Sequence, residues 1–169
     1  MVYDHHHHSA EPTILDNFEK EDEKSDLFVG CISRDFAYFG DKQGCVYVYD
    51  LKTKSLVIRE RPGGSVSGIK QVKANDLDEL LVSSNDRCIR LFQVSRSAPV
   101  LSLRLKIKDL VNRFHWSQVS FSGDNEYVVA GTMSKERHNV YIWDKVSGNL
   151  LKILEGPSEG LFDFSVSKE

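Results

Sequence analysis

The chain has 169 residues, of which 40% are hydrophobic and 28% are charged, and this balance is that of an ordinary globular protein. Its net charge of −3 provides no bulk attraction to nucleic acid or to an acidic membrane surface. No apolar run reaches the roughly 18 residues of a membrane-spanning helix, and no apolar signal core stands near the N-terminus. The three cysteines lie in strand-like runs, which favours buried thiols in a reducing compartment over disulfides. We therefore expect neither a secreted, a transmembrane nor a collagen-like protein.

The first 25 residues differ in composition from the rest of the chain. Between Asp16 and Asp26, six acidic residues stand against two lysines, a pattern typical of a solvated and mobile connector. An acidic docking motif is the alternative. The run from His5 to His8 favours a flexible loop over a cloning remnant or a metal site, because metal ligands need a rigid frame and supporting hydrogen bonds. We expect residues 1–25 to be flexible and residues 26–169 to form the folded domain.

From residue 27 onward, short runs of Val, Ile, Tyr and Phe alternate with polar residues and are separated by Gly, Asp, Asn and Ser. This period of two is typical of β-strands. Three of the runs end in an aromatic residue, at Tyr49, Phe92 and Trp143, with spacings of 43 and 51 residues. A repeat near this length that ends in an aromatic residue and Asp is typical of WD-repeat propeller blades, which have four strands each.

Counting the strands predicts three blades, over residues 27–60, 67–107 and 116–154, followed by part of a fourth at 161–166. Propellers usually need four to eight blades to close their ring. Three blades leave two end faces uncovered. The predicted fold is therefore all-β, a segment of a larger WD-repeat β-propeller.

The middle repeat matches the blade pattern best, at 84–92. We expect Asp86 to accept backbone N–H bonds in the turn before the third strand, whereas the first and third repeats lack an Asp at this position. Ile89 and Leu91 should pack between blades, with Arg90 facing the other way. The residues predicted to be buried between blades are Val46, Val48, Ile89, Leu91, Val140 and Ile142.

Motifs for catalysis or for ligand binding are weak. The segment 63–68 is neither a phosphate loop nor a nucleophile elbow and reads as a turn between blades. His115 and His138 stand singly, without a Cys or carboxylate at metal-ligand spacing. Trp116 and Trp143 favour a place in the core over a base-stacking platform. We expect no catalytic residue, no metal, no cofactor and no small-molecule substrate.

Three basic residues alternate with leucine and isoleucine on one predicted strand, at Arg104, Lys106 and Lys108. This pattern predicts an outer strand with a solvated basic face and a buried apolar face. Contact of the basic face with an acidic partner is the alternative.

The sequence from 109 to 156 contains motifs more specific than the general pattern of a propeller blade. Its most specific elements are DLVNR at 109–113, Trp116, FSGD at 121–124, EYVVAG at 126–131, YIW at 141–143, GNL at 148–150 and KIL at 152–154. This string closely resembles one WD-repeat family, that of retinoblastoma-binding protein five and its yeast counterpart Swd-one. A weaker likeness extends back through 83–92 and 41–50 to residue 26, whereas residues 1–25 align poorly.

The resemblance implies a non-catalytic scaffold in the nuclear COMPASS complex, which methylates lysine four of histone H3. The partners it implies are the SET-domain methyltransferase, a second WD-repeat subunit that binds the histone tail, an Ash-two-like subunit and the nucleosome. The family's earlier blades, its closing blade and the tail that docks the methyltransferase lie outside the resemblance. A general WD-repeat adaptor in a ubiquitin ligase or an RNA-processing complex is the alternative, and only the string from 109 to 156 separates the two.

Because the family contacts nucleosomal DNA through basic loop residues, our candidate nucleosome-facing residues are Arg113, Lys135 and Arg137. Arg113 follows the family-like D-L-V-N, and the other two lie in a long turn between predicted strands. Loops on a propeller's rim are free to reach a partner, and arginine can bond phosphate in a forked geometry. This turn is longer than the family's and contains Glu136, which weakens the local attraction. The alternative is that Arg113 pairs with Asp109 and the loop charges are only solvated.

Overall fold

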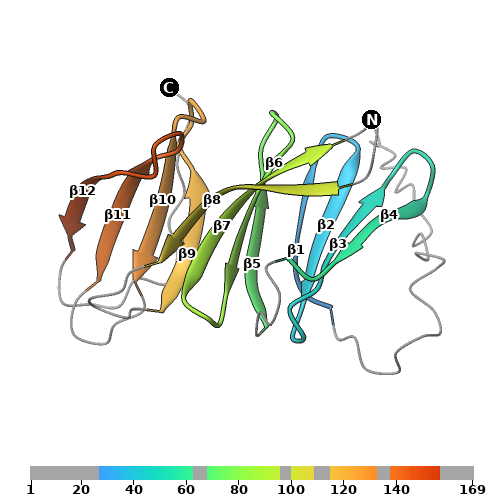
Figure 1. The fold of residues 1–169 in the computed structure, drawn as a ribbon, viewed down its shortest axis with the longest axis horizontal. Coiled ribbons are helices and arrows are strands. Elements are labelled where there is room, and N and C mark those ends of the chain that lie inside the picture. Colours follow the sequence, from blue (N-terminus) through green and yellow to red (C-terminus); the bar gives the residue numbers. More distant parts are fainter. Residues whose placement is uncertain (1–26, 63–67, 96–99, 109–114, 133–137, 157–169) are drawn as a thin grey trace, which may run out of the picture.

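The computed structural model describes residues 27–62, 68–95, 100–108, 115–132 and 138–156. Within these residues the chain forms twelve β-strands in three four-stranded antiparallel sheets (Figure 1), which we name blades 1, 2 and 3. Blade 1 contains β1 (Leu27–Ser33), β2 (Phe36–Asp41), β3 (Val46–Asp50) and β4 (Ser55–Glu60). Blade 2 contains β5 (Ile69–Ala74), β6 (Glu79–Ser84), β7 (Cys88–Ser95) and β8 (Val100–Lys108). Blade 3 contains β9 (Trp116–Phe121), β10 (Tyr127–Thr132), β11 (Asn139–Asp144) and β12 (Leu150–Glu155).

Each blade is a simple meander, so strands that follow one another in the chain are neighbours in the sheet. The first strands of successive blades contact each other, β1 with β5 and β5 with β9, whereas β4, β8 and β12 form the outer edges. The three sheets stand in a row with their faces against each other (Figure 1). This arrangement confirms the predicted propeller segment, and the blades begin and end within two residues of the predicted bounds.

Two apolar clusters hold the blades together, one at each junction. Buried residues between blades 1 and 2 are Tyr38, Val46, Val48, Ile58, Ile69, Val72, Leu80, Val82, Phe92, Val94 and Leu101. Those between blades 2 and 3 are Leu81, Ile89, Leu91, Ile107, Trp116, Val119, Phe121, Val128, Ala130, Tyr141 and Trp143. No backbone ladder joins the described blades, so burial of this apolar surface is the main force between them.

Two local features fix how closely the blades approach. At Gly40 on β2, a Cβ atom would lie 2.4 Å from Cγ2 of Ile69 on β5, so only glycine permits this contact. Between β5 and β9, Gln71 donates a hydrogen bond to Oε1 of Gln118 at 2.9 Å and accepts one from the backbone N–H of Val119 at 2.7 Å. One tight packing contact thus joins blades 1 and 2, and one polar bridge joins the inner strands of blades 2 and 3.

The predicted core is confirmed for Val46, Val48, Ile89 and Leu91. It is wrong for Val140 and Ile142, which are only half-buried. These two residues occupy the positions of Ile89 and Leu91 on the next repeat and face away from blade 2, where no described element covers them. Their neighbours Tyr141 and Trp143 face blade 2 and are buried instead.

Several expectations concern residues that the structure does not describe. The acidic and histidine-rich segment 1–25 lies outside the described residues, and so does the strand predicted at 161–166. The part of the chain that the structure describes contains no helix long and apolar enough to cross a membrane.

We expect the isolated chain to self-associate through the outward face of blade 3. Val140 lies opposite the exposed Leu154 on this face, and Ile142 continues the same apolar surface. Changing Ile142→Lys and Leu154→Lys should lower the mass measured by light scattering, because charge replaces the contact surface. Leu77→Lys, an exposed site in the β5–β6 turn, is the control. A sharp monomer peak with cooperative melting of the unchanged chain would show that three blades suffice.

Candidate interaction surface

The three candidate residues Arg113, Lys135 and Arg137 lie outside the described residues. The segments that contain them, 109–114 and 133–137, connect β8 to β9 and β10 to β11. In antiparallel meanders these strand ends lie at the same end of the blades as the β6–β7 turn. The described residues at that end therefore give the surroundings of the predicted surface.

Three basic side chains lie together there and form what we name the basic cluster: Lys70 on β5, Arg87 in the β6–β7 turn and His115 just before β9. Nζ of Lys70 is 3.4 Å from Nδ1 of His115, and Nε of Arg87 donates to Nε2 of the same ring at 3.4 Å. Burial and the two neighbouring cations lower the pKa of His115, so the ring is mainly neutral at pH 7. A neutral imidazole has one acceptor nitrogen and cannot accept from both cations at once. Neither cation forms an ion pair with a described carboxylate, so the basic cluster has donors left for an anion.

Arg87 has a backbone conformation that most side chains avoid. Its φ is 64°, in the left-handed region, and the equivalent residue of the β2–β3 turn is Gly44, with a φ of 90°. The indole N–H of the buried Trp116 donates to the Arg87 carbonyl at 3.0 Å and holds the turn in place. Arg34, Lys54, Asp78 and Asn125 adopt the same conformation in other turns, so the left-handed backbone places the Arg87 side chain without marking it as special.

Beside the basic cluster, Asp86 and Arg90 form a largely buried ion pair. Nη2 of Arg90 is 2.5 Å from Oδ2 of Asp86, and Nη1 donates to the Ser84 hydroxyl at 2.8 Å. The other carboxylate oxygen accepts the backbone N–H of Cys88 at 3.2 Å, which confirms the predicted role of Asp86 in the turn. Burial alone would raise the pKa of the Asp86 carboxyl, but hydrogen bonds from Arg90, Ser84 and Cys88 outweigh it and hold the pKa well below its usual range. Arg90 faces away from the contact with blade 3, as the alternation predicts, yet it is buried.

The other blades have a buried polar residue at the same place, the last residue of β2 and of β10. These residues are Asp41 in blade 1 and Thr132 in blade 3, and both correspond to Ser84. Asp41 accepts hydrogen bonds from the Cys45 N–H at 2.8 Å and from the Tyr47 hydroxyl at 2.9 Å. Burial and the bond to Asp41 raise the pKa of Tyr47 to about 12. The first repeat lacks an Asp at the expected turn position, but Asp41, two positions earlier, accepts backbone N–H bonds from the turn instead. The Gly-Asp pair just before the turn was the sequence feature from which this role could have been predicted.

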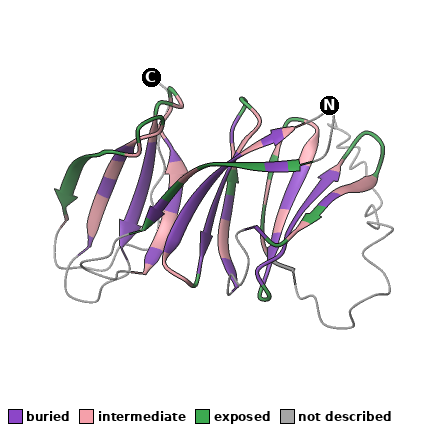
Figure 2. Cartoon of the chain, in the orientation of Figure 1, coloured by how far each residue is buried: buried purple, intermediate pink, exposed green. Residues whose placement is uncertain are grey.

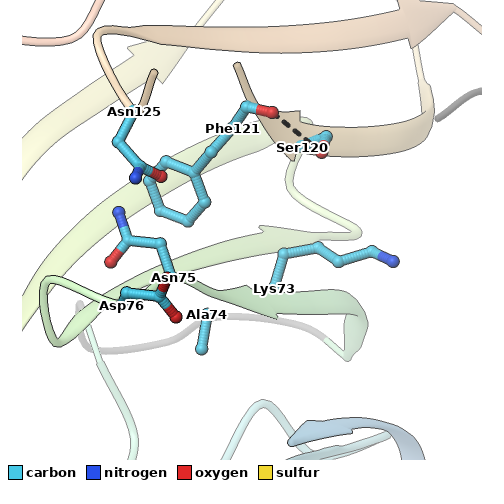
Figure 3. Close-up of a pocket in the computed structure, with 7 residues that line it drawn as sticks. All are labelled: Lys73, Ala74, Asn75, Asp76, Ser120, Phe121 and Asn125. Atoms are coloured by element: carbon cyan, nitrogen blue, oxygen red, sulfur yellow. Dashed lines mark hydrogen bonds between the residues drawn. The ribbon is translucent and has the colours of Figure 1, made fainter. Parts of the chain in front are cut away.

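A shallow pocket of about 210 Å³ opens at the opposite end of blades 2 and 3 (Figure 3). Its lining residues are Lys73, Ala74, Asn75, Asp76, Ser120, Phe121 and Asn125. The amide oxygen of Asn75 accepts the backbone N–H groups of Leu77 and Glu79 at 3.0 Å each, and the Ser120 hydroxyl donates to the Phe121 carbonyl at 3.1 Å. The Asn75 and Ser120 side chains are thus engaged with backbone groups of their own segments.

The described residues contain no group of three or more His, Cys, Asp or Glu side chains that could hold a metal ion. His138 is buried just before β11, where its carbonyl accepts the N–H of Gly156 at 2.9 Å. The cysteines are free thiols, and burial raises the pKa of Cys31 to about 11. A protonated thiol is a poor nucleophile. The glycine-rich segment considered as a phosphate loop lies outside the described residues except for Gly68.

No protein-family model matches the chain. It is 39% identical over 127 residues to the retinoblastoma-binding-like protein E of Dictyostelium discoideum, a match that covers 75% of this chain and 24% of the relative. It is 37% identical over 93 residues to the COMPASS component SWD1 of Saccharomyces cerevisiae, covering 52% of this chain and 22% of the relative. Among solved structures, the Cps50 (Swd1) β-propeller domain of Myceliophteria thermophila matches with a TM-score of 0.72 and 32% identity, covering 81% of this chain and 46% of that one.

These comparisons confirm the resemblance and the propeller architecture. The chain spans about a quarter of the length of the two curated relatives, and slightly under half of the solved propeller. The matched relatives include a component of COMPASS. The chain therefore belongs to the family of retinoblastoma-binding protein five and Swd1, and it corresponds to part of that family's β-propeller.

Proposed function

We propose that this chain is part of a non-catalytic scaffold subunit in the nuclear complex that methylates lysine four of histone H3. The observation that carries this proposal is the match to the Swd1 propeller over most of the chain, together with the relative that is a COMPASS component. The proposed partners are a SET-domain methyltransferase, a second WD-repeat subunit and an Ash-two-like subunit. Rigid blades with polar turns suit a scaffold, because they present loops at fixed positions.

We assign the nucleosome-facing surface to the end of the blades that holds the basic cluster. The candidates Arg113, Lys135 and Arg137 belong to connections between strands that meet at this end. The basic cluster supports the assignment, because it offers spare hydrogen-bond donors at the same end of the blades. With a net charge of −3 for the chain, attraction to phosphate has to come from such a local group.

The test changes Arg113→Glu, Lys135→Glu and Arg137→Glu together in the full-length protein within the assembled complex. Nucleosome affinity should fall, and its dependence on salt should flatten, because fewer counterions are released on binding. Complex assembly and methylation of a free histone peptide should be unchanged, since neither requires contact with DNA. Fluorescence anisotropy with labelled nucleosomes at several salt concentrations measures both effects.

The matched control makes the same change in net charge elsewhere, with Lys54→Glu, Lys73→Glu and Lys152→Glu, all at exposed positions. This control should leave the salt slope unchanged. An unchanged affinity and slope in the first variant would reject the surface and leave the scaffold proposal intact. A pull-down from nuclear extract that returned ligase or spliceosomal subunits without a SET-domain partner would reject the scaffold proposal itself.

A further inference from the structure

The outer strand of blade 2 carries more positive charge than the outer strands of its neighbours. β8 contains Arg104, Lys106 and Lys108 and no acidic residue, and we name these three residues the basic edge. β4 and β12 each contain one basic and one acidic residue. β8 is also longer, with nine residues against six in each of the others. The difference is specific to blade 2 and is not a general property of outer strands in this chain.

The three side chains of the basic edge are exposed and form no hydrogen bond or ion pair with a described residue. The equivalent of Lys106 in blade 1 is Arg59, whose guanidinium lies 5.9 Å from the centre of the Tyr47 ring and is thus engaged. Figure 2 shows β8 crossing the front of the molecule with much of its length exposed. The charges on β8 are therefore available to a partner.

The edge of β8 is also open for main-chain pairing. β8 pairs with β7 on one side, and no described strand pairs with its other side. Blades 1 and 3 flank blade 2 on both faces, so this edge stays on the outer circumference however many blades complete the ring. The register shift opposite Leu91 and Phe92 leaves Arg104 unpaired in a bulge, and Val100 and Leu103 are 46% and 51% exposed.

We propose that the outer edge of β8 binds an extended acidic segment of a partner protein, which adds a fifth strand to blade 2. Main-chain hydrogen bonds provide the affinity, as in other cases of strand addition. Lys106 and Lys108 select carboxylates at alternate positions of the segment, because alternate residues of a regular strand lie about 7 Å apart on one side, and Arg104 adds positive charge at the bulge. Val100 and Leu103 select apolar residues toward one end of it.

A peptide fits this surface better than a nucleic acid does. The edge offers backbone donors and acceptors at strand spacing, which a peptide backbone matches and a phosphate backbone does not. The basic edge runs along the outer strand, and its last residue, Lys108, pairs with Cys88 next to Arg87 of the basic cluster, so the two surfaces meet only at this end of blade 2. The proposal therefore goes beyond the proposed nucleosome contact and does not depend on it.

The test titrates the 169-residue chain, at concentrations where light scattering finds it monomeric, into a fluorescein-labelled peptide of ten residues, with glutamate at alternate positions and two valines at one end. Binding should be saturable, and backbone amides of β8 that do not bond to β7 should become protected from hydrogen exchange. Changing Arg104→Gln, Lys106→Gln and Lys108→Gln should weaken binding about tenfold, the effect of losing three exposed ion pairs of modest strength. Circular dichroism checks that this variant keeps its strands.

Two controls separate strand pairing from simple charge attraction. The variant with Lys54→Gln, Lys73→Gln and Lys152→Gln loses the same charge at other exposed sites and should bind as tightly as the unchanged chain. A peptide of the same sequence that is N-methylated at alternate residues cannot donate along one edge and should bind at least tenfold more weakly.

Four results would overturn the proposal. The first is equal binding of the methylated peptide, and the second is competition by duplex DNA that matches competition by unlabelled peptide. The third is that the unchanged chain does not bind the peptide and the variant without the basic edge self-associates more strongly. The basic edge would then serve only to prevent β8 strands of two copies from pairing. The fourth is binding that appears only after the acids between Asp16 and Asp26 are changed to amides, because the chain's own segment would then be the occupant.

Discussion

Replacing Trp116 with alanine is expected to lower the free energy of unfolding by about 3–5 kcal/mol, the usual cost of truncating a buried aromatic side chain. Trp116 is 2% exposed and lies between blades 2 and 3, where its ring meets those of Tyr141 and Trp143 edge to face at 5.5 and 5.4 Å. Its indole N–H also bonds the Arg87 carbonyl. The substitution therefore removes apolar contact, two ring contacts and a turn bond together. We expect a loss of the same size for Trp143→Ala.

The measurement is urea unfolding, at concentrations where light scattering finds the chain monomeric, followed by circular dichroism and by tryptophan emission. The chain contains two tryptophans, and both lie in this cluster, so emission reports the junction of blades 2 and 3 directly. The double variant should lose less than the sum of the single losses, because the two rings contact each other. Val146→Ala, at a side chain that is 90% exposed, should stay within about 0.5 kcal/mol of the unchanged chain. A loss below 1 kcal/mol for Trp116→Ala would contradict the packing described above.

The strand order and most blade bounds could be predicted, because period-two alternation and the aromatic spacing are local signals. Alternation assigns Val140 and Ile142 to a face but does not say whether another blade covers that face. Arg90 can be buried because it pairs with the Asp86 carboxylate four residues earlier. The positive charge of Arg90, considered by itself, did not predict that this side chain would be buried. The basic cluster was not predicted, since it joins Lys70 to a residue 45 positions away, and only the stacking of blades brings such residues together.

We expect Asp86→Ala to lower the free energy of unfolding at pH 7 by about 3–5 kcal/mol, because it leaves the guanidinium of Arg90 buried without a counter-charge. The side chain of Arg90 is 3% exposed, whereas that of Asp86 is 28% exposed. Arg90→Leu should therefore cost less, since water can still reach the remaining carboxylate. The double variant should recover most of the loss of Asp86→Ala, because neither charge is then present. A double variant no more stable than Asp86→Ala would contradict the ion-pair explanation.

The same pair should make stability depend on pH in the acid range. The pKa of Asp86 in the folded chain lies below its unfolded value of about 3.9, because hydrogen bonds from Arg90, Ser84 and Cys88 outweigh the effect of burial. Its stabilising contribution is complete above the unfolded pKa and is lost as the pH falls through the folded pKa. Below about pH 4, the unchanged chain should therefore lose stability more steeply than the double variant, as measured by urea unfolding from pH 7 to pH 3. Asp50, Asp124 and Asp144, whose pKa values are lowered by hydrogen bonds within their turns, occur in both proteins and cancel in the difference. Parallel pH curves for the two proteins would show that the folded pKa of Asp86 is not depressed.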